Sequence, residues 1–239
     1  MRLVTWNCNM ALHQKLPAFA GLRADIAILP ECANLEILSS RAPELQFSSA
    51  DWVGRHKHKG LGVFSFGAWK LARSADYDDS LEFAIPLVVS GPATFHLLAI
   101  WACYPKKRGP RAQYLGPTRQ AVARYTDFLC GAPSVVAGDF NNNVIWDKPG
   151  AAVNHAELVA DLGQAGLQSA YHAFTGEVQG KERRPTIYWT RNIEKPYHID
   201  YCFIPAEWRS KLQGVTVGSA EKWVPVSDHA PLTVDLAMG

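Results

Sequence analysis

The sequence has little excess charge and no long apolar run. Its 24 Lys and Arg residues against 22 Asp and Glu residues leave a formal net charge of +2. That balance is too small to indicate nucleic-acid binding by itself, but it avoids the strong repulsion that a very acidic protein meets near phosphates. No stretch approaches the ~20 apolar residues of a membrane span. The N-terminal segment reads as a strand rather than a signal peptide. We therefore expect a cytoplasmic protein without a membrane span.

Cysteine is sparse, and the spacing of the cysteines suggests neither a disulfide framework nor a metal site. The five cysteines form no close pair of the kind that binds metal ions, and most lie within or beside apolar runs. An odd number of scattered cysteines is typical of reduced, partly buried thiols in a reducing compartment.

Repeats, low-complexity tracts and Pro/Ser-rich linkers are also lacking. A length of 239 residues fits one sizeable domain better than two, so we expect a single domain over residues 1–239. The glycine-rich stretch KGLGVF at 59–64 leads into a strand and has no P-loop lysine at the required place, so it does not indicate a phosphate cradle.

The regular elements that the sequence does indicate are mostly strands. Strand-like segments occupy residues 2–6, 25–30, 62–66, 83–89, 95–104, 134–139, 186–189, 198–204 and 232–236. Helical periodicity appears near 12–22, near 117–130 and near 154–166, where Asn154 provides a good N-cap. Because strands outnumber helices and no strict βαβ alternation is present, the pattern predicts an α/β fold with two packed sheets and helices outside.

Polar side chains recur where these apolar runs stop. The candidates are Asn7, Glu31, Tyr104, Asp139, Asn141, Asp200, Asp228 and His229. Taken singly, an Asn or Asp after a strand is usually turn chemistry, and a Ser-Asp pair can be a simple cap. Asp200 is harder to dismiss, because it lies inside an apolar strand and a buried carboxylate needs a partner. Taken jointly, such groups at sheet ends can converge on one ligand site.

Five of these segments occur in an order that resembles the endonuclease/exonuclease/phosphatase superfamily. They are TWN (5–7), LPE (29–31), GDFN (138–141), HIDY (198–201) and SDH (227–229). The motifs span nearly the whole chain, and GDFN and SDH weigh most. The resemblance implies a four-layered α/β sandwich, with two packed mixed β-sheets flanked by helices, and metal-dependent hydrolysis of a phosphoester.

The resemblance also implies a metal site. Glu31 is the obvious ligand for Mg²⁺, with Mn²⁺ as an alternative ion, because Mg²⁺ favours oxygen donors and needs only one or two carboxylates. Asn7 would add a carbonyl oxygen or hold Glu31 in place. Asp228 would contribute directly or through water.

Catalytic roles follow from the same pattern. Asp139 would orient or deprotonate the attacking water, and Asn141 would offer its NH₂ to the phosphate or the nucleophile. His229 would lie by the phosphate as a donor or proton shuttle, with Asp200 fixing its ring orientation and tautomer. Tyr104 would donate its hydroxyl to a phosphate oxygen.

Substrate contacts are expected from basic loops and from aromatic residues. Basic clusters lie at 55–59, 106–111 and 181–184. The second, which contains Lys106, would follow a phosphate backbone, although charged loops are often only solvated. Arg119 would reach phosphate or simply lie on a helix surface. Trp189 and Tyr197 flank a loop that leads into HIDY and are the better candidates for stacking on bases. Phe140 should point into the core, and Asn142 and Asn143 are either loop residues or substrate contacts.

The sequence departs from the superfamily at two places. Pro30 precedes Glu31 where glutamine is common, and WACYP replaces the usual asparagine-containing strand end. These departures leave the metal chemistry intact and put the substrate in question. We expect a monomeric nuclease acting on DNA or RNA. The alternatives are a phosphodiesterase or phosphatase for a lipid, nucleotide or sugar phosphate, and a catalytically silent nucleic-acid-binding domain.

Overall fold

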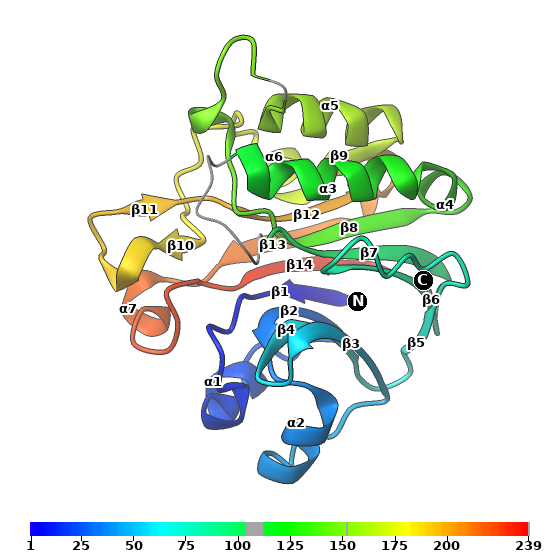
Figure 1. The fold of residues 1–239 in the computed structure, drawn as a ribbon, viewed down its shortest axis with the longest axis vertical. Coiled ribbons are helices and arrows are strands. Elements are labelled where there is room, and N and C mark those ends of the chain that lie inside the picture. Colours follow the sequence, from blue (N-terminus) through cyan, green and yellow to red (C-terminus); the bar gives the residue numbers. More distant parts are fainter. Residues whose placement is uncertain (104–111, 152, 239) are drawn as a thin grey trace.

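Two β-sheets packed face to face form the centre of the protein, and helices cover both outer faces (Figure 1). The structure is a computed structural model that describes residues 1–103, 112–151 and 153–238. The layers run from helices α3 and α5 through the two sheets to helices α1 and α2. The four-layered α/β sandwich predicted from the sequence is thereby confirmed.

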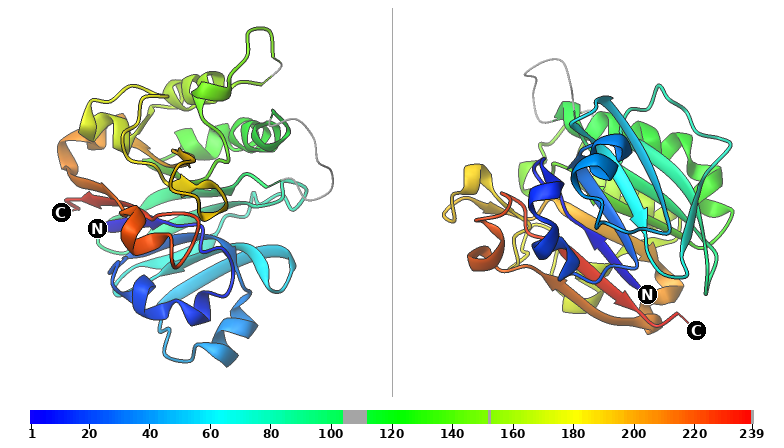
Figure 2. Two further views of the ribbon diagram at one scale, coloured as in Figure 1. Left: turned by 90° about the vertical axis from the view of Figure 1, so that its left-hand side faces the viewer. Right: turned by 90° about the horizontal axis from the view of Figure 1, so that it is seen from below.

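The first sheet joins the two ends of the chain. In the described part of the chain its strand order is β13–β14–β1–β2–β4–β3. Its strands are β1 (Arg2–Thr5), β2 (Ile26–Cys32), β3 (Ser49–His56), β4 (Lys59–Ser65), β13 (Leu212–Val217) and β14 (Leu232–Leu236). The pair β1 and β2 is parallel, and β14 runs antiparallel to β1. The Met1 amino group donates to the carbonyl oxygen of Leu236 at 2.7 Å, so both ends of the chain lie side by side (Figure 2).

The second sheet is mixed as well, with the order β5–β6–β7–β8–β12–β9 over the described residues. Its strands are β5 (Lys70–Arg73), β6 (Ala84–Ser90), β7 (Phe95–Trp101), β8 (Ser134–Asp139), β9 (Leu167–Ser169) and β12 (Asp200–Pro205). The pair β7 and β8 is parallel, and β8 and β12 are antiparallel. A short hairpin, β10 (Ile187–Tyr188) and β11 (Pro196–Tyr197), lies apart from both sheets.

Strand alternation divides the core into three parts. Successive side chains of a strand point to opposite faces, so Leu3 packs between the sheets while Val4 packs under the helices of the first sheet. In the same way Val135 points between the sheets and Val136 toward the helices of the second sheet. Strands buried on both faces read as continuous apolar runs, which is why the sequence shows them clearly.

The helices that cover the sheets are short. The helices are α1 (Leu16–Ala20), α2 (Leu35–Arg41), α3 (Ala112–Arg124), α4 (Thr126–Cys130), α5 (His155–Gln164), α6 (Ala170–Thr175) and α7 (Ala220–Trp223), and the 3₁₀ turns are Leu12–Gln14, Val144–Trp146, Trp189–Arg191 and Ala206–Lys211. In the described residues no helix is long and apolar enough to span a membrane.

Two helix predictions need correction. The single helix expected near 117–130 begins earlier, and it breaks into α3 and α4 at Tyr125, whose hydroxyl accepts a hydrogen bond from the Asp78 amide at 2.9 Å. Asn154 precedes α5 as expected, but its side chain makes no capping bond. The Asp147 carboxylate caps the helix instead, accepting from the His155 and Ala156 amides at 2.7 and 2.9 Å. A carboxylate brought in from another turn can satisfy the same free amides.

Strands that lie at sheet edges were missed by the sequence analysis. The strands β3, β5 and β13 are half-exposed or exposed along most of their length. Their side chains are mixed in polarity, since only one face of an edge or surface strand is buried, and the apolar signal is correspondingly weak.

The topology brings several chain segments to one end of the sandwich. The parallel strands β1 and β2 end there, and the antiparallel strand β14 begins there. In the second sheet β8 ends at the same place, opposite the start of β12. Polar residues that are far apart in the sequence therefore lie together.

Candidate active site

Asp139 is at the centre of this polar end of the sandwich. It is the last residue of β8 and pairs across the sheet with Asp200, the first residue of β12. Its side chain is fully buried. One carboxylate oxygen, Oδ1, accepts from the Asn141 backbone amide at 2.8 Å, and Oδ2 accepts from Asn7 Nδ2 at 3.0 Å. A residue of the first sheet thus holds a carboxylate of the second.

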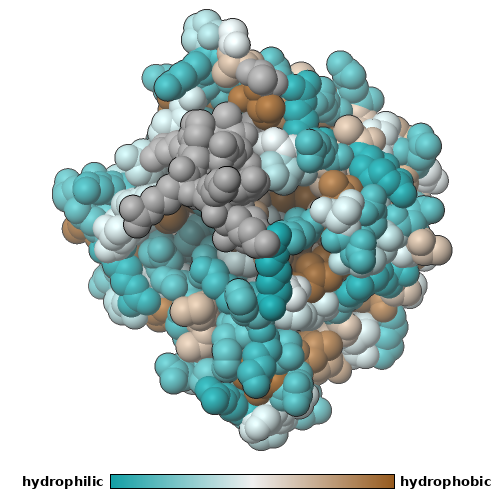
Figure 3. Space-filling model, in the orientation of Figure 1, coloured by the Kyte–Doolittle hydropathy of each residue, from teal (hydrophilic) through white to brown (hydrophobic). Residues whose placement is uncertain are grey.

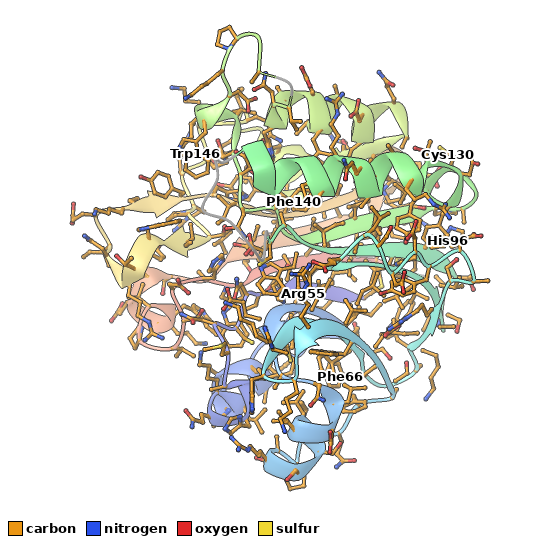
Figure 4. The ribbon with its side chains drawn as sticks, in the orientation of Figure 1. Arg55, Phe66, His96, Cys130, Phe140 and Trp146 are labelled. Atoms are coloured by element: carbon orange, nitrogen blue, oxygen red, sulfur yellow. The ribbon has the colours of Figure 1, made fainter. Side chains whose placement is uncertain are left out.

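The residues on either side of Asp139 fix its place. Gly138 has φ of +147°, and a Cβ there would lie 1.8 Å from the carbonyl oxygen of Ile100, so no other residue fits without backbone movement. Phe140 is fully buried in the core under α3 and α5, as predicted (Figure 4). The next residue, Asn141, takes a left-handed conformation with φ of +48°. Its side-chain NH₂ donates to the Ala102 carbonyl at 2.9 Å and to Asp139 Oδ2 at 3.2 Å.

His229 and Asp200 form a buried pair next to Asp139. The imidazole Nδ1 lies 2.8 Å from Asp200 Oδ2, and Nε2 lies 4.0 Å from Asp139 Oδ2. The Asp200 amide donates to Thr186 Oγ1 at 3.0 Å. The backbone of His229 is held from both sides: Ser227 Oγ accepts from its amide at 3.1 Å, and its carbonyl oxygen accepts from Trp6 Nε1 at 3.0 Å. The ring orientation is therefore set, as the sequence analysis expected of Asp200.

Burial and mutual charge shift the ionisation of this group. Burial, together with the negative charge of Asp200, raises the pKa of Asp139 to about 7, while His229 opposes the shift. Burial alone would lower the pKa of His229. The negative charges of Asp200 and Asp139 outweigh that effect and raise it to about 10. A carboxylate that titrates near neutral pH next to an imidazolium is typical of a site for proton transfer.

A chain of hydrogen bonds connects the two partly exposed carboxylates of the site, Glu31 and Asp228. Asn7 Nδ2 donates to Glu31 Oε1 at 3.4 Å, and Asn7 Oδ1 accepts from the Asn9 amide at 3.0 Å. Asn9 Nδ2 then donates to Asp228 Oδ1 at 2.8 Å. Through these contacts Asn7 is placed to hold both Glu31 and Asp139.

Glu31 is presented by an irregularity in β2. The pairing of β2 with β4 shifts between Pro30 and Cys32, and Glu31 takes φ of +60°. A bulge of this kind re-aims a side chain next to a functional site. The side chain of Glu31 is 19% exposed, and Lys59 Nζ lies 3.0 Å from Glu31 Oε2.

The donor set fits a hard divalent ion. Asp139, Asp200 and His229 offer ligand atoms within 4.8 Å of one another, and Glu31 and Asp228 add carboxylates nearby. Mg²⁺ prefers oxygen ligands and keeps several waters, so the partly exposed Glu31 and Asp228 suit it best. The imidazole of His229 is committed through Nδ1 to Asp200, which favours a proton-handling role over a ligand role.

Aromatic residues of the β10–β11 hairpin lie beside this site. The Tyr188 amide donates to the Asp228 carbonyl at 2.7 Å, which places the β10–β11 hairpin against the Asp228–His229 segment. Trp189 follows directly and is 46% exposed. Tyr197 packs its ring on Trp146 with centroids 5.0 Å apart. The two aromatic residues predicted to contact substrate therefore lie on one hairpin next to His229.

Arg119, another predicted substrate contact, is not brought to the site. The Arg119 guanidinium bonds Asp161 at 2.7 Å and Glu157 at 2.5 Å, joining α3 to α5, which favours the helix-surface interpretation. Tyr104 and Lys106 lie outside the described residues. Asn142 and Asn143 are both buried, so they are not substrate contacts on the surface.

The structure adds residues that the sequence analysis did not single out. Asn9 joins Asn7 to Asp228, Lys59 pairs with Glu31, Ser227 accepts from the His229 amide and donates to the Asn7 carbonyl, and Thr186 receives the Asp200 amide. Two of these lie within the quoted motifs or next to them: Ser227 opens SDH, and Asn9 follows TWN by two positions. Lys59 and Thr186 gave no comparable signal, because their partners are distant in the sequence.

Comparison with known proteins supports the fold. Neither a protein-family model nor a curated protein matches the sequence. Among solved structures, the chain shares its fold with a 3′ phosphatase, a 3′-5′ exonuclease and two endonucleases, and this is the α/β fold that the resemblance implied.

Three of these structures cover almost the whole chain. A structure of the 3′ phosphatase NExo from Neisseria bound to product DNA hairpin is 19% identical, with a TM-score of 0.71 over 99% of each chain. An AP endonuclease from Archaeoglobus fulgidus is 14% identical, with a TM-score of 0.71 over 99% of each chain. The endonuclease domain of TRAS1, a telomere-specific non-LTR retrotransposon, is 13% identical, with a TM-score of 0.68 over 99% of this chain and 98% of that one.

Proposed function

We propose that the protein hydrolyses phosphodiester bonds with the help of Mg²⁺, and that its substrate is DNA. One observation carries the proposal: Asn7 and Asn141 hydrogen-bond the Asp139 carboxylate, and Asp200 holds the His229 ring with Nε2 4.0 Å from that carboxylate. The carboxylates of Glu31 and Asp228 lie at the edge of this group. That group combines a base, a proton donor and oxygen ligands, which are the components that phosphoryl transfer requires.

Each residue has a role that its contacts support. Asp139 would accept the proton of the attacking water, because its raised pKa lets it exchange a proton near neutral pH. The His229 imidazolium, oriented by Asp200, would donate a hydrogen bond to a phosphate oxygen. Glu31 and Asp228 would hold the metal ion, with Asn7 and Asn9 fixing their positions. When bound, Mg²⁺ would neutralise charge on the phosphate oxygens.

Asn141 has a holding role in this proposal. Its NH₂ is directed to protein acceptors, the Ala102 carbonyl and the Asp139 carboxylate. It would therefore fix the carboxylate and the strand end after β7, and reach the phosphate only by exchanging one of these bonds.

The structural neighbours support DNA as the substrate. One is described as a 3′ phosphatase bound to a DNA hairpin, another as a 3′-5′ exonuclease, and a third as an AP endonuclease. Trp189 and Tyr197 would stack on bases at the edge of the site. The face shown in Figure 3 is predominantly hydrophilic outside the grey atoms.

The test is a substrate panel run with Mg²⁺, with Mn²⁺ and with chelator. It contains single-stranded and duplex DNA, an abasic duplex, 3′-phosphorylated ends, RNA, and small phosphate esters of lipid, nucleotide and sugar. The proposal expects cleavage of DNA that chelator abolishes and Mg²⁺ restores, with a loss of at least ~100-fold in kcat for Asp139→Asn. If Asp139→Asn and His229→Ala both match the wild type, the assigned site is wrong.

The panel also separates the remaining alternatives. Turnover confined to small phosphate esters would indicate a phosphatase or phosphodiesterase, and nucleic-acid binding without turnover with either ion would indicate a silent binding domain. Activity on DNA should fall steeply with salt, because phosphate contacts release counterions. We further propose a monomeric, single-domain protein of the cytoplasm, which the five free cysteines support.

A further inference from the structure

Lys59 places a positive charge on the proposed metal ligand. Its ammonium lies 3.0 Å from Glu31 Oε2 and 5.5 Å from the centroid of the Trp101 ring. Lys59 belongs to the RHKHK cluster at 55–59, which the sequence analysis assigned to a basic loop. The structure shows that this residue begins β4 and pairs with Glu31, whereas Arg55 of the same cluster, which is labelled in Figure 4, bonds Glu82.

A metal ion bound to Glu31 would compete with the Lys59 ammonium for the charge of one carboxylate. A divalent ion bound to Glu31 would lie within a few ångströms of the ammonium, and like charges at that distance repel strongly when partly removed from water. The side chain of Lys59 is 41% exposed, and a lysine side chain is long and flexible. The ammonium is therefore free to leave Glu31, while Glu31, fixed by its bulge and by Asn7, is not.

The surroundings of the ammonium also include the second sheet. The Trp101 ring that it faces belongs to β7, and Trp101 is the register partner of Asp139 in β8. Lys59 thus lies near the strand end that carries the carboxylate that would activate the water. A phosphate group held between the metal ligand and Asp139 would lie within reach of its flexible side chain.

We propose that Lys59 exchanges partners on binding: its ammonium neutralises Glu31 in the metal-free protein and moves to a phosphate oxygen of the DNA when a metal ion takes Glu31. This inference rests on the proposed function and names a phosphate contact beyond it. Metal binding frees Lys59, and Lys59 then favours the anion, so the affinities for metal and DNA are coupled. By linkage each ligand raises the affinity of the other by the same factor.

The experiment measures metal binding rather than turnover. Calorimetric titration of Mn²⁺ into the DNA-free protein compares the wild type with Lys59→Met, Lys59→Arg and Lys57→Met. Lys57 is the matched control, because it is an exposed lysine of the same hairpin and its replacement removes the same charge. We expect Lys59→Met to bind Mn²⁺ about tenfold more tightly, because the competing charge is gone. Lys59→Arg and Lys57→Met should stay within about twofold of the wild type.

A second titration follows a short DNA oligonucleotide by anisotropy with Ca²⁺ in place of Mg²⁺. The plot of log affinity against log salt should lose about 0.9 of its slope in Lys59→Met, the loss of one phosphate contact. Removing Ca²⁺ should leave wild type and Lys59→Met with the same slope, since without metal the ammonium stays on Glu31.

The outcomes are distinguishable. If Lys59→Met binds Mn²⁺ no more tightly than the wild type, or if Lys57→Met gains as much, the exchange is refuted while the proposed function stands. An unchanged salt slope in Lys59→Met with Ca²⁺ refutes the phosphate contact. A wild type that binds no Mn²⁺ refutes both the metal-dependent function and this inference.

Discussion

The bond between Asp200 and His229 can be tested by removing one charge without changing shape. Asp200→Asn keeps the volume of the side chain, and the amide oxygen can still accept from Nδ1. The Asp200 Oδ1 atom has no hydrogen-bond partner among the described residues, so the new NH₂ displaces no existing bond. The variant therefore isolates the charge of Asp200 from its position.

The size of the effect follows from the bond. A hydrogen bond to a charged group contributes about 1.5–3 kcal/mol and a neutral one about 0.5–1.5 kcal/mol, so the loss is about 1–1.5 kcal/mol. Since one pKa unit equals about 1.36 kcal/mol, the pKa of His229 should fall from its raised value by about one unit or more. The negative charge of Asp200 also raises the pKa of Asp139, so that pKa should fall too.

The assay is the pH profile of kcat/KM on the best DNA substrate at saturating Mg²⁺. If deprotonated Asp139 and protonated His229 are required, activity in the wild type rises as pH passes about 7 and falls as pH passes about 10. In Asp200→Asn both limbs should move to lower pH, and the plateau value of kcat should fall about tenfold, the equivalent of the ~1–1.5 kcal/mol lost from the bond. Thermal melts check that the variant is folded. An unchanged profile, or a uniform loss without movement of either limb, would refute the assigned roles.

Three further predictions concern stability and substrate binding. Gly138→Ala should lower the free energy of unfolding by more than about 4 kcal/mol, because its Cβ would collide with the Ile100 carbonyl. The control is Gly163→Ala, where a Cβ meets nothing within 4 Å and the free energy of unfolding should rise by about 0.5–1 kcal/mol. Thermal and urea melts compare the two variants. Burial lowers the pKa of His155 to about 4, below the 6.5 of the unfolded chain, so the unfolded state binds the proton more tightly. His155 therefore contributes up to about 3 kcal/mol of stability above pH 6.5, and this contribution is lost as the pH falls from 6.5 to 4. Urea midpoints across that range should show this loss in the wild type and a flatter curve in His155→Phe. Trp189→Ala should weaken binding of single-stranded DNA by about 1–3 kcal/mol, and unchanged affinity by anisotropy would exclude stacking on that ring.

The sequence by itself determined the interior strands of the fold. The segments ending at Asp139 and Leu236 were placed to the residue, because strands buried on both faces are unbroken apolar runs. The polar residues at the ends of the interior strands also predicted that Glu31, Asp139 and His229 belong to one site. Motif order was sufficient for this, since each motif lies at a strand end and the sheet edges coincide.

Pairings between distant segments were decided only by the tertiary structure. Asn9 and Asp228 are bonded across 219 positions, and Lys59 meets Glu31 across two strands. Nothing local marks such partners, because hydrogen bonds and ion pairs between strands depend on register and on bulges. The same holds for Arg119, whose guanidinium proved to join two helices rather than to meet phosphate.

The stretch VVAGDFNNN shows both sides of this division. The sequence predicted its apolar half as a strand and Asp139 as a site residue. It did not predict the hydrogen-bond partners of the three asparagines. Asn141 turns back to hold Asp139, and Asn143 is buried, donating to the His198 carbonyl and the Tyr201 hydroxyl at 2.9 Å each. Identical side chains thus take different roles, because a sequence specifies which donors exist while only the folded backbone decides which acceptors lie within reach.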